Sequence, residues 1–137
     1  DMVGILAVEM FLTKSGDILV NEIAPRPHNS GHHTIECCDT SQFAQHLRAI
    51  LGLPLGCTTL IQPGAMINLL GEKGHTGTAI YKGLSELLSH PNVYAHLYGK
   101  EQTKPFRKMG HVTITGKNLE EVKSTAAQVK NLVHIIA

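Results

Sequence analysis

Hydrophobic and polar positions along the chain fall into short apolar runs and longer segments with helical periodicity. The apolar runs are rich in aliphatic residues and bounded by turn residues, which is typical of strands. The predicted strands are residues 4–12, 18–23, 65–70, 93–99 and 111–116. Apolar residues spaced three and four positions apart predict helices. The predicted helices are residues 39–51, 78–90 and 118–133.

The first helix carries the clearest start and stop signals. Asp39 stands three residues before Gln42, which is the spacing of a capping box. Gly52 and Pro54 follow the last periodic position and end the helix. The predicted apolar face of this helix consists of Phe43, Leu47, Ile50 and Leu51.

The stretch GLPLGCTTLIQPG at residues 52–64 is punctuated by glycine and proline and predicts a linker. Strands and helices occur on both sides of it. We therefore expect an α+β fold with two parts, residues 1–60 and residues 61–137.

Composition narrows the class of protein. The 137 residues are 42% hydrophobic and 17% charged, with a net charge of +1, which indicates a globular chain and no field for nucleic acid. No apolar run approaches the ~20 residues of a membrane span. Three cysteines, two of them adjacent, make a poor disulfide framework and favour a reduced, cytoplasmic setting. The chain enters an apolar run without an initiator methionine, so we expect it to be part of a longer protein.

Two glutamates on the first two strands are candidates for chemistry. If the turn is Ser15-Gly16, or the four residues 14–17, Glu9 lies opposite Glu22 with Cβ atoms about 4.5–5.5 Å apart. A shared proton, a basic side chain or a divalent cation could offset their repulsion, and hard oxygen ligands suit Mg²⁺. Alternatively, both glutamates lie on a solvated face. A three-residue turn with a bulge would place them on a diagonal.

The polar loop that follows the second strand is a candidate binding loop. Pro25 and Pro27 restrict its backbone, which lowers the entropic cost of holding side chains in one geometry. Arg26 offers a guanidinium for a bidentate anion contact, while His28 and Asn29 offer hydrogen bonds. An ordinary surface turn is the alternative.

Two further clusters contain metal-binding or basic residues. A zinc site is conceivable, although the spacing matches no standard zinc pattern. Its ligands would come from His28, His32, His33, Cys37 and Cys38. A basic loop at residues 99–110 is a plausible phosphate clamp or a solvated charge run. Its cations are Lys100, Lys104, Arg107 and Lys108.

The segment AVEMFLTKSGDILVNEIAPRPHNSGHHTIE, followed by SQFAQHLRAILGLPLG and later RKMGHVTITG, resembles a known family. The family is the carboxyaminoimidazole ribonucleotide synthetases of the ATP-grasp superfamily, also called the ATPase subunit of phosphoribosylaminoimidazole carboxylase. The resemblance covers the chain as the C-terminal part of such an enzyme. It implies the end of an ATP-grasp domain, an antiparallel sheet with helix, followed by a small α+β domain.

The resemblance also implies a reaction and a set of roles. ATP would activate bicarbonate, and the carboxyl group would pass to aminoimidazole ribonucleotide in purine biosynthesis. Glu9 and Glu22 match the positions that hold Mg²⁺ against ATP. Ala24 stands where many ATP-grasp enzymes have an asparagine ligand, which leaves a two-glutamate site. Arg26 and His28 match catalytic positions. Substrate-binding positions are matched by Asn29, Lys100, Arg107 and Lys108.

Two other functions stay open at this point. One is a different ATP-grasp ligase of the purine pathway, and the other is a non-catalytic nucleotide-binding module. The family is commonly dimeric, so we expect a homodimer. Because the lysines and adenine pocket of the family lie outside this segment, we expect the segment alone to be inactive.

Overall fold

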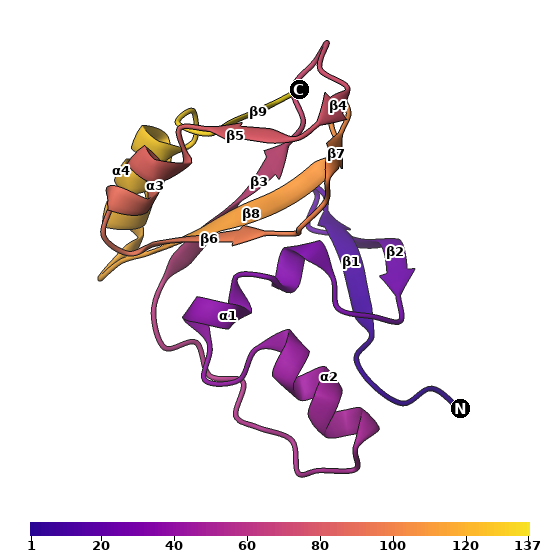
Figure 1. The fold of residues 1–137 in the computed structure, drawn as a ribbon. Helices are drawn as coiled ribbons and strands as arrows, with labels where there is room; N and C mark the ends of the chain where they lie inside the picture. The colour runs from indigo at the N-terminus through magenta and orange to yellow at the C-terminus, as the bar shows by residue number, and fades with distance from the viewer. The chain divides into compact units, whose positions relative to one another are not determined.

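The first two aliphatic runs form a two-stranded antiparallel hairpin in the computed structural model, which describes residues 1–137 (Figure 1). The strands are β1 (Ala7–Leu12) and β2 (Ile18–Ala24). The loop between them has five residues, 13–17, and Leu12 pairs with Ile18. Neither the two-residue nor the four-residue turn expected from the sequence is present.

A bulge at Asn21 resets the register of this hairpin. Met10 pairs with Val20, but the next pair is Glu9 with Glu22, so Asn21 has no partner of its own in the ladder. The predicted pairing of the two glutamates is therefore observed. It arises from a longer loop and an extra residue in β2, because the one-residue shift of the loop is cancelled by the bulge.

The chain after β2 contains two short helical segments before the expected helix begins. These are the 3₁₀ helix η1 (Asn29–Gly31) and α1 (Thr34–Cys37). Helix α2 (Gln42–Ile50) is capped by Ser41, whose hydroxyl accepts a hydrogen bond from the amide of Ala44 at 3.2 Å. The predicted start at Asp39 is wrong, because the amide of Asp39 donates to the carbonyl of Thr59 at 3.0 Å instead.

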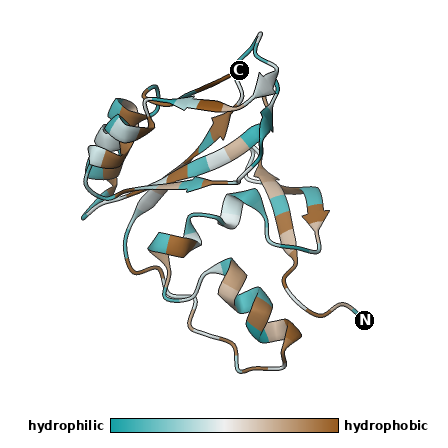
Figure 2. Ribbon diagram, in the orientation of Figure 1, coloured by the Kyte–Doolittle hydropathy of each residue, from teal (hydrophilic) through white to brown (hydrophobic).

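Tertiary contacts divide the chain into two compact units, residues 1–61 and 62–137. The first unit leaves much of its apolar surface exposed. On α2, Phe43 is 38%, Leu47 54% and Ile50 48% exposed. Figure 2 shows hydrophobic positions on α2 and on the hairpin strands. One face of the hairpin is made entirely of exposed apolar residues: Val8, Met10, Leu12, Ile18, Val20 and Ile23.

The second unit is built on a three-stranded antiparallel sheet. Its strand order is β3 (Gly64–Leu70), β8 (Lys108–Thr115) and β6 (Val93–Leu97). Helix α4 (Leu119–Val129) packs against β3 and β8, and helix α3 (Leu84–Ser89) packs against β6 (Figure 1).

Two small antiparallel pairs complete the second unit. One joins β4 (Gly77–Thr78) to β7 (Gln102–Thr103). The other joins β5 (Ile80–Lys82) to β9 (His134–Ile136). The core beneath the helices is aliphatic and consists of Leu69, Leu87, Val93, Met109, Val112, Ile114, Val122, Val129 and Ile135.

Several predicted boundaries in this unit are wrong, and each miss has a tertiary cause. The helix expected at 78–90 begins only at Leu84, because the preceding residues pair as strands with distant segments. Gly83 has a φ of 78°, and a Cβ there would lie 1.9 Å from the carbonyl oxygen of Leu132. The helix expected to reach residue 133 ends at Val129, since the chain then turns into β9.

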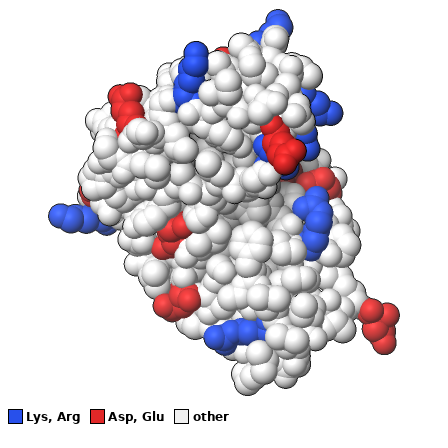
Figure 3. All heavy atoms as spheres, in the orientation of Figure 1, with Lys and Arg blue, Asp and Glu red and all other residues white.

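Two properties of the whole chain bear on its partners. The longest helix, α4, has 11 residues, and none of the helices has the length and hydropathy needed to cross a membrane. On the face drawn in Figure 3, positive and negative side chains are scattered, and neither sign forms a continuous patch.

Candidate functional site

The two predicted metal-ligating glutamates come together on the hairpin. Glu9 of β1 and Glu22 of β2 are direct partners across the antiparallel ladder. Their side chains are 39% and 53% exposed, so both carboxylates are open to a ligand from solvent. The bulge, which inserts one residue next to this pair, fixes the pair in the register.

Asn21, the bulge residue, stabilises one of these carboxylates. Its side-chain amide donates to Glu9 Oε1 at 2.5 Å. The contact offsets part of the repulsion between the two glutamates and limits the rotamers that Glu9 can adopt. Sequence reasoning missed Asn21, because its contact depends on a bulge that the spacing of residues does not reveal.

His28 approaches the same pair from the loop after β2. Its Nε2 lies 2.7 Å from Glu22 Oε1 and 3.9 Å from Glu9 Oε2, and its side chain is 10% exposed. The amide of Ser30 donates to His28 Nδ1 at 3.4 Å, and the Ser30 hydroxyl lies 2.8 Å from the same atom. Because Nδ1 accepts, the ring proton is on Nε2 and points to the carboxylate of Glu22.

These three residues form the group in the chain with the geometry of a metal site. One ligand atom from each of Glu9, Glu22 and His28 lies within 4.8 Å of the others. Two carboxylates offer the hard oxygen donors that Mg²⁺ prefers. Because the proton of His28 is on the nitrogen that faces Glu22, the histidine suits the role of an orienting donor to a ligating carboxylate. The residues therefore fit a two-carboxylate magnesium site.

The other predicted loop residues lie close by in sequence but differ in their environment. Arg26 is exposed, and its guanidinium donates to the carbonyl of Pro27 at 3.0 Å. Asn29 is half-buried and is the first residue of η1. His33 contacts the Ser30 carbonyl through Nδ1 at 2.9 Å. The zinc cluster of histidines and cysteines considered above does not form: Cys37 is fully buried in α1, and the ring of His32 stacks on Phe43.

The predicted phosphate-binding residues belong to the second unit. The ammonium of Lys100 donates to the carbonyl of Lys108 at 2.5 Å and lies 5.4 Å from the centre of the Tyr98 ring. The guanidinium of Arg107 donates to the carbonyl of Gln102 at 2.9 Å. The sequence predicted an irregular loop here, but the segment contains β7 and the beginning of β8.

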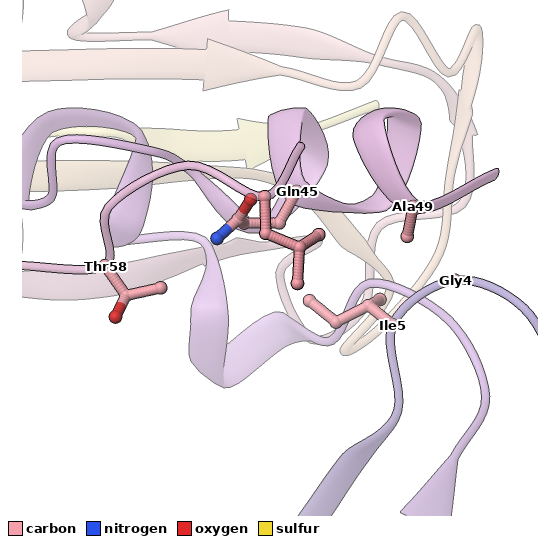
Figure 4. A pocket seen from close by; sticks show the side chains of 6 residues that line it. Gly4, Ile5, Gln45, Ala49 and Thr58 are labelled. Atoms are coloured by element: carbon pink, nitrogen blue, oxygen red, sulfur yellow. The ribbon is translucent and has the colours of Figure 1, made fainter. Parts of the chain in front are cut away.

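The hollow drawn in Figure 4 is a different feature from the glutamate site. It has a volume of about 260 Å³ and contains no titratable side chain. Its lining is mostly apolar and consists of Gly4, Ile5, Gln45, Ala49, Leu55 and Thr58. The glutamate pair, and not this hollow, therefore has the residue types that a metal-dependent reaction needs.

Comparison with known families matches both parts of the chain. Residues 1–43 match the ATP-grasp domain, and residues 64–125 match the phosphoribosylaminoimidazole carboxylase C-terminal domain. The N5-carboxyaminoimidazole ribonucleotide synthase of Bacillus subtilis is 55% identical over 113 residues, which are 82% of this chain and 28% of that protein.

Solved structures give the same result. The N5-carboxyaminoimidazole ribonucleotide synthetase of Thermotoga maritima is 53% identical with a TM-score of 0.93, over 98% of this chain and 38% of that one. The synthase of Aspergillus clavatus, solved with ADP and 5-aminoimidazole ribonucleotide, is 40% identical with a TM-score of 0.83, over 94% of this chain and 34% of that one.

The chain thus spans 28% of the length of the Bacillus relative and 38% of the Thermotoga chain. Its mixed, antiparallel α+β architecture agrees with the fold expected from the resemblance. The chain belongs to the N5-carboxyaminoimidazole ribonucleotide synthase family and contains part of the family's ATP-grasp domain followed by its C-terminal domain.

Proposed function

We propose that this chain is part of an ATP-dependent ligase that carboxylates aminoimidazole ribonucleotide with bicarbonate in purine biosynthesis. The observation within the chain that best supports this function is the opposed pair Glu9 and Glu22 with His28 beside it. A relative of the same family was solved with ADP and 5-aminoimidazole ribonucleotide, which are a product and a substrate of this reaction.

In this proposal, Glu9 and Glu22 would hold the Mg²⁺ that accompanies the phosphates of ATP. The ion would neutralise phosphate charge, and the carboxylates would fix its position. His28 donates its Nε2 proton to Glu22 and so keeps one carboxylate oriented. Asn21 does the same for Glu9 through its amide. Asn21 and His28 would thus orient the two carboxylates that would hold the ion.

The remaining roles follow from charge and position. Arg26 is exposed and follows Glu22 closely in the sequence. Its guanidinium offers a planar donor for bicarbonate. His28 and Asn29 complete the loop that would face the reacting amine and the nucleotide. Lys100, Arg107 and Lys108 would bind the 5′-phosphate of the nucleotide. Lys100 and Arg107 are anchored by backbone carbonyls, which reduces the entropy lost on binding an anion.

We also propose a boundary between the two domains near residues 60 and 61, a homodimeric enzyme and a cytoplasmic location. The boundary falls where the Pro- and Gly-containing segment before β3 joins the two compact units. Limited proteolysis would test the boundary, and light scattering of the full-length enzyme would test the dimer.

The central experiment measures ADP release by the full-length protein. We expect release to require Mg²⁺, bicarbonate and aminoimidazole ribonucleotide together, with the carboxyamino nucleotide as product. A different ATP-grasp ligase would release ADP with another acceptor, and a binding module would be stabilised by the nucleotide without turnover. Either result would overturn the proposal. The 137-residue segment alone should release no ADP under the same conditions.

A further inference from the structure

Gln42 is a buried polar residue at the start of α2 that belongs to none of the roles above. It is 7% exposed, and its side chain points at the loop that carries His28. Burial of an amide is costly unless its donors and acceptor are all paired. The hydrogen-bond partners of the Gln42 side chain therefore indicate its role.

The amide of Gln42 contacts the backbone of His28 at two points. Its Oε1 accepts from the His28 N–H at 2.8 Å, and its Nε2 donates to the His28 carbonyl at 2.8 Å. A side chain thus pairs with both backbone groups of one residue, as a neighbouring strand would. The backbone of His28 is fixed from a helix that starts 14 residues later.

The same amide also fixes the ring of His32. Gln42 Nε2 lies 2.8 Å from His32 Nδ1. The His28 N–H identifies Oε1 as the acceptor, so Nε2 is the donor in both of its contacts. His32 Nδ1 must therefore accept, and its ring proton is on Nε2. Gln42 selects one tautomer of His32 as well as the backbone position of His28.

Close packing and further hydrogen bonds restrict the position of Gln42 relative to the loop. A Cβ on Gly31 would lie 2.6 Å from Gln42 Oε1, so a larger residue at this position would have to displace the Gln42 amide. The backbone amide of Gln42 donates to the hydroxyl of Thr34 at 3.0 Å, and that hydroxyl donates to the Gly31 carbonyl at 2.5 Å. Gln42 at the start of α2 is thus hydrogen-bonded to His28, His32 and Thr34.

We propose that Gln42 is a positioning residue for the carboxylation reaction: it holds His28 against Glu22 and keeps His32 in the Nε2–H tautomer. This inference rests on the proposed function. Gln42 itself touches neither carboxylate, and it acts through the two histidines. Because the Nε2 of His28 reaches Glu22 from a backbone that Gln42 fixes, a shift of the loop would misplace that contact.

The chain offers a matched control one helical turn further along α2. Gln45 accepts from the Gly56 amide at 2.8 Å and donates to the Gly56 carbonyl at 2.7 Å. It therefore makes the same paired contact with a loop backbone, but on a segment without candidate catalytic residues. Figure 4 shows Gln45 at the apolar hollow. A purely structural glutamine of this kind should affect stability and leave the chemistry alone.

The experiment compares Gln42→Met, Gln42→Glu and Gln45→Met in the full-length protein. Both methionine variants should lower the Tm by similar amounts. Only the Gln42 variants should lower kcat, by about 10- to 100-fold, as expected for the loss of an outer-shell orienting group. Gln42→Glu is included because it keeps the size of the side chain and an acceptor for His28 but cannot donate. A Gln42→Met variant that loses no more kcat than Gln45→Met would overturn the proposal.

A second measurement separates this inference from the proposed function. Long-range ¹H–¹⁵N spectra of the wild-type protein should show His32 protonated on Nε2, and Gln42→Glu should move the proton to Nδ1. A wild-type His32 protonated on Nδ1 would contradict the role of Gln42 whatever the enzyme's activity. Conversely, a wild-type protein without bicarbonate-dependent turnover would refute the proposed function while the spectra still report on Gln42.

Discussion

Glu22 and His28 are in direct contact beside the hairpin, with 2.7 Å between the carboxylate oxygen and the imidazole Nε2. The neighbouring Glu9 receives its own donor from Asn21. Two like charges about 4 Å apart repel by roughly 1 to 4 kcal/mol near a protein surface. A hydrogen bond to a charged group contributes about 1.5 to 3 kcal/mol. The hydrogen bonds from His28 and Asn21 are therefore strong enough to offset the repulsion between the two carboxylates. The pair is thus maintained and remains open to a cation.

Replacing Glu22 with glutamine tests the metal role directly. The Glu22→Gln variant of the full-length protein should lose at least two orders of magnitude in Mg²⁺-dependent ADP release, because an amide oxygen is a weaker ligand than a carboxylate. The matched control is Glu120→Gln, since Glu120 is 84% exposed and pairs only with Lys123 on the surface of α4. Equal rates in the two variants would refute a role for Glu22 in metal binding.

Removing the amide of Asn21 should weaken the same site less severely. We expect Asn21→Ala to reduce the apparent affinity for Mg²⁺ by about 10-fold, since Glu9 loses the donor that restricts its rotamers. Titration of Mg²⁺ at saturating ATP measures this shift. Ser15→Ala, in the loop of the same hairpin, controls for general loosening of the two strands. If both variants bind Mg²⁺ as the wild type does, Asn21 does not support Glu9.

Arg107 should matter for the nucleotide and not for ATP. The Arg107→Ala variant should raise the KM for aminoimidazole ribonucleotide about 10-fold or more, because a charge-assisted contact with the phosphate is lost. The control is Lys130→Ala, at the end of α4. A KM for ATP that rises in parallel, or no change in either KM, would contradict a specific phosphate contact.

Local sequence patterns predicted the hairpin and the sheet strands well, because their signals are short-range. The strand runs that became β1, β2, β3, β6 and β8 are all bounded by turn residues. The apolar face of α2 also has the predicted spacing, yet Phe43, Leu47 and Ile50 are exposed in this chain. Periodicity identifies an apolar face, but it does not show which residues cover that face.

Features that depend on distant pairing were beyond local patterns. Residues 80–82 have the spacing of a helix, but they pair with β9 more than fifty residues away. The pairing of Glu9 with Glu22 was anticipated, while the bulge at Asn21 that sets it was not. Gln42 was interpreted as part of a capping box, because nothing local indicates that its side chain reaches back to His28.

Adjacent leucines on α3 offer a clean test of the core of the second unit. Leu87 is 1% exposed and lies in the core, whereas Leu88 is 57% exposed. Leu87→Ala should lower the free energy of unfolding by about 2 to 5 kcal/mol, from lost burial and the cavity that remains. Leu88→Ala should change it by less than about 1 kcal/mol. Urea unfolding of both variants measures the difference, and similar losses would show that the helix packs on a different face.

Because the Cys37 thiol is buried, we expect the stability of the folded chain to decline at alkaline pH. Burial, and next the neighbouring Cys38 and Glu36, raise the pKa of the Cys37 thiol above its ordinary value of 9.0. The folded state therefore holds this proton more tightly than the unfolded state does. Its contribution to stability is complete below about pH 9 and is lost as the pH rises from there through the pKa of the folded state.

A comparison of wild type with Cys37→Ala isolates this effect, because other alkaline titrations occur in both proteins. The pKa values of Tyr81 and Tyr98 are also raised by burial, and their contributions cancel in the difference. Under reducing conditions, the wild type should lose stability relative to the variant as the pH rises above about pH 9. Cys57→Ala controls for the loss of an exposed thiol. A difference that stays constant with pH would mean that the Cys37 thiol is no harder to ionise in the folded chain than in the unfolded one, so its burial in α1 would have no consequence for alkaline stability.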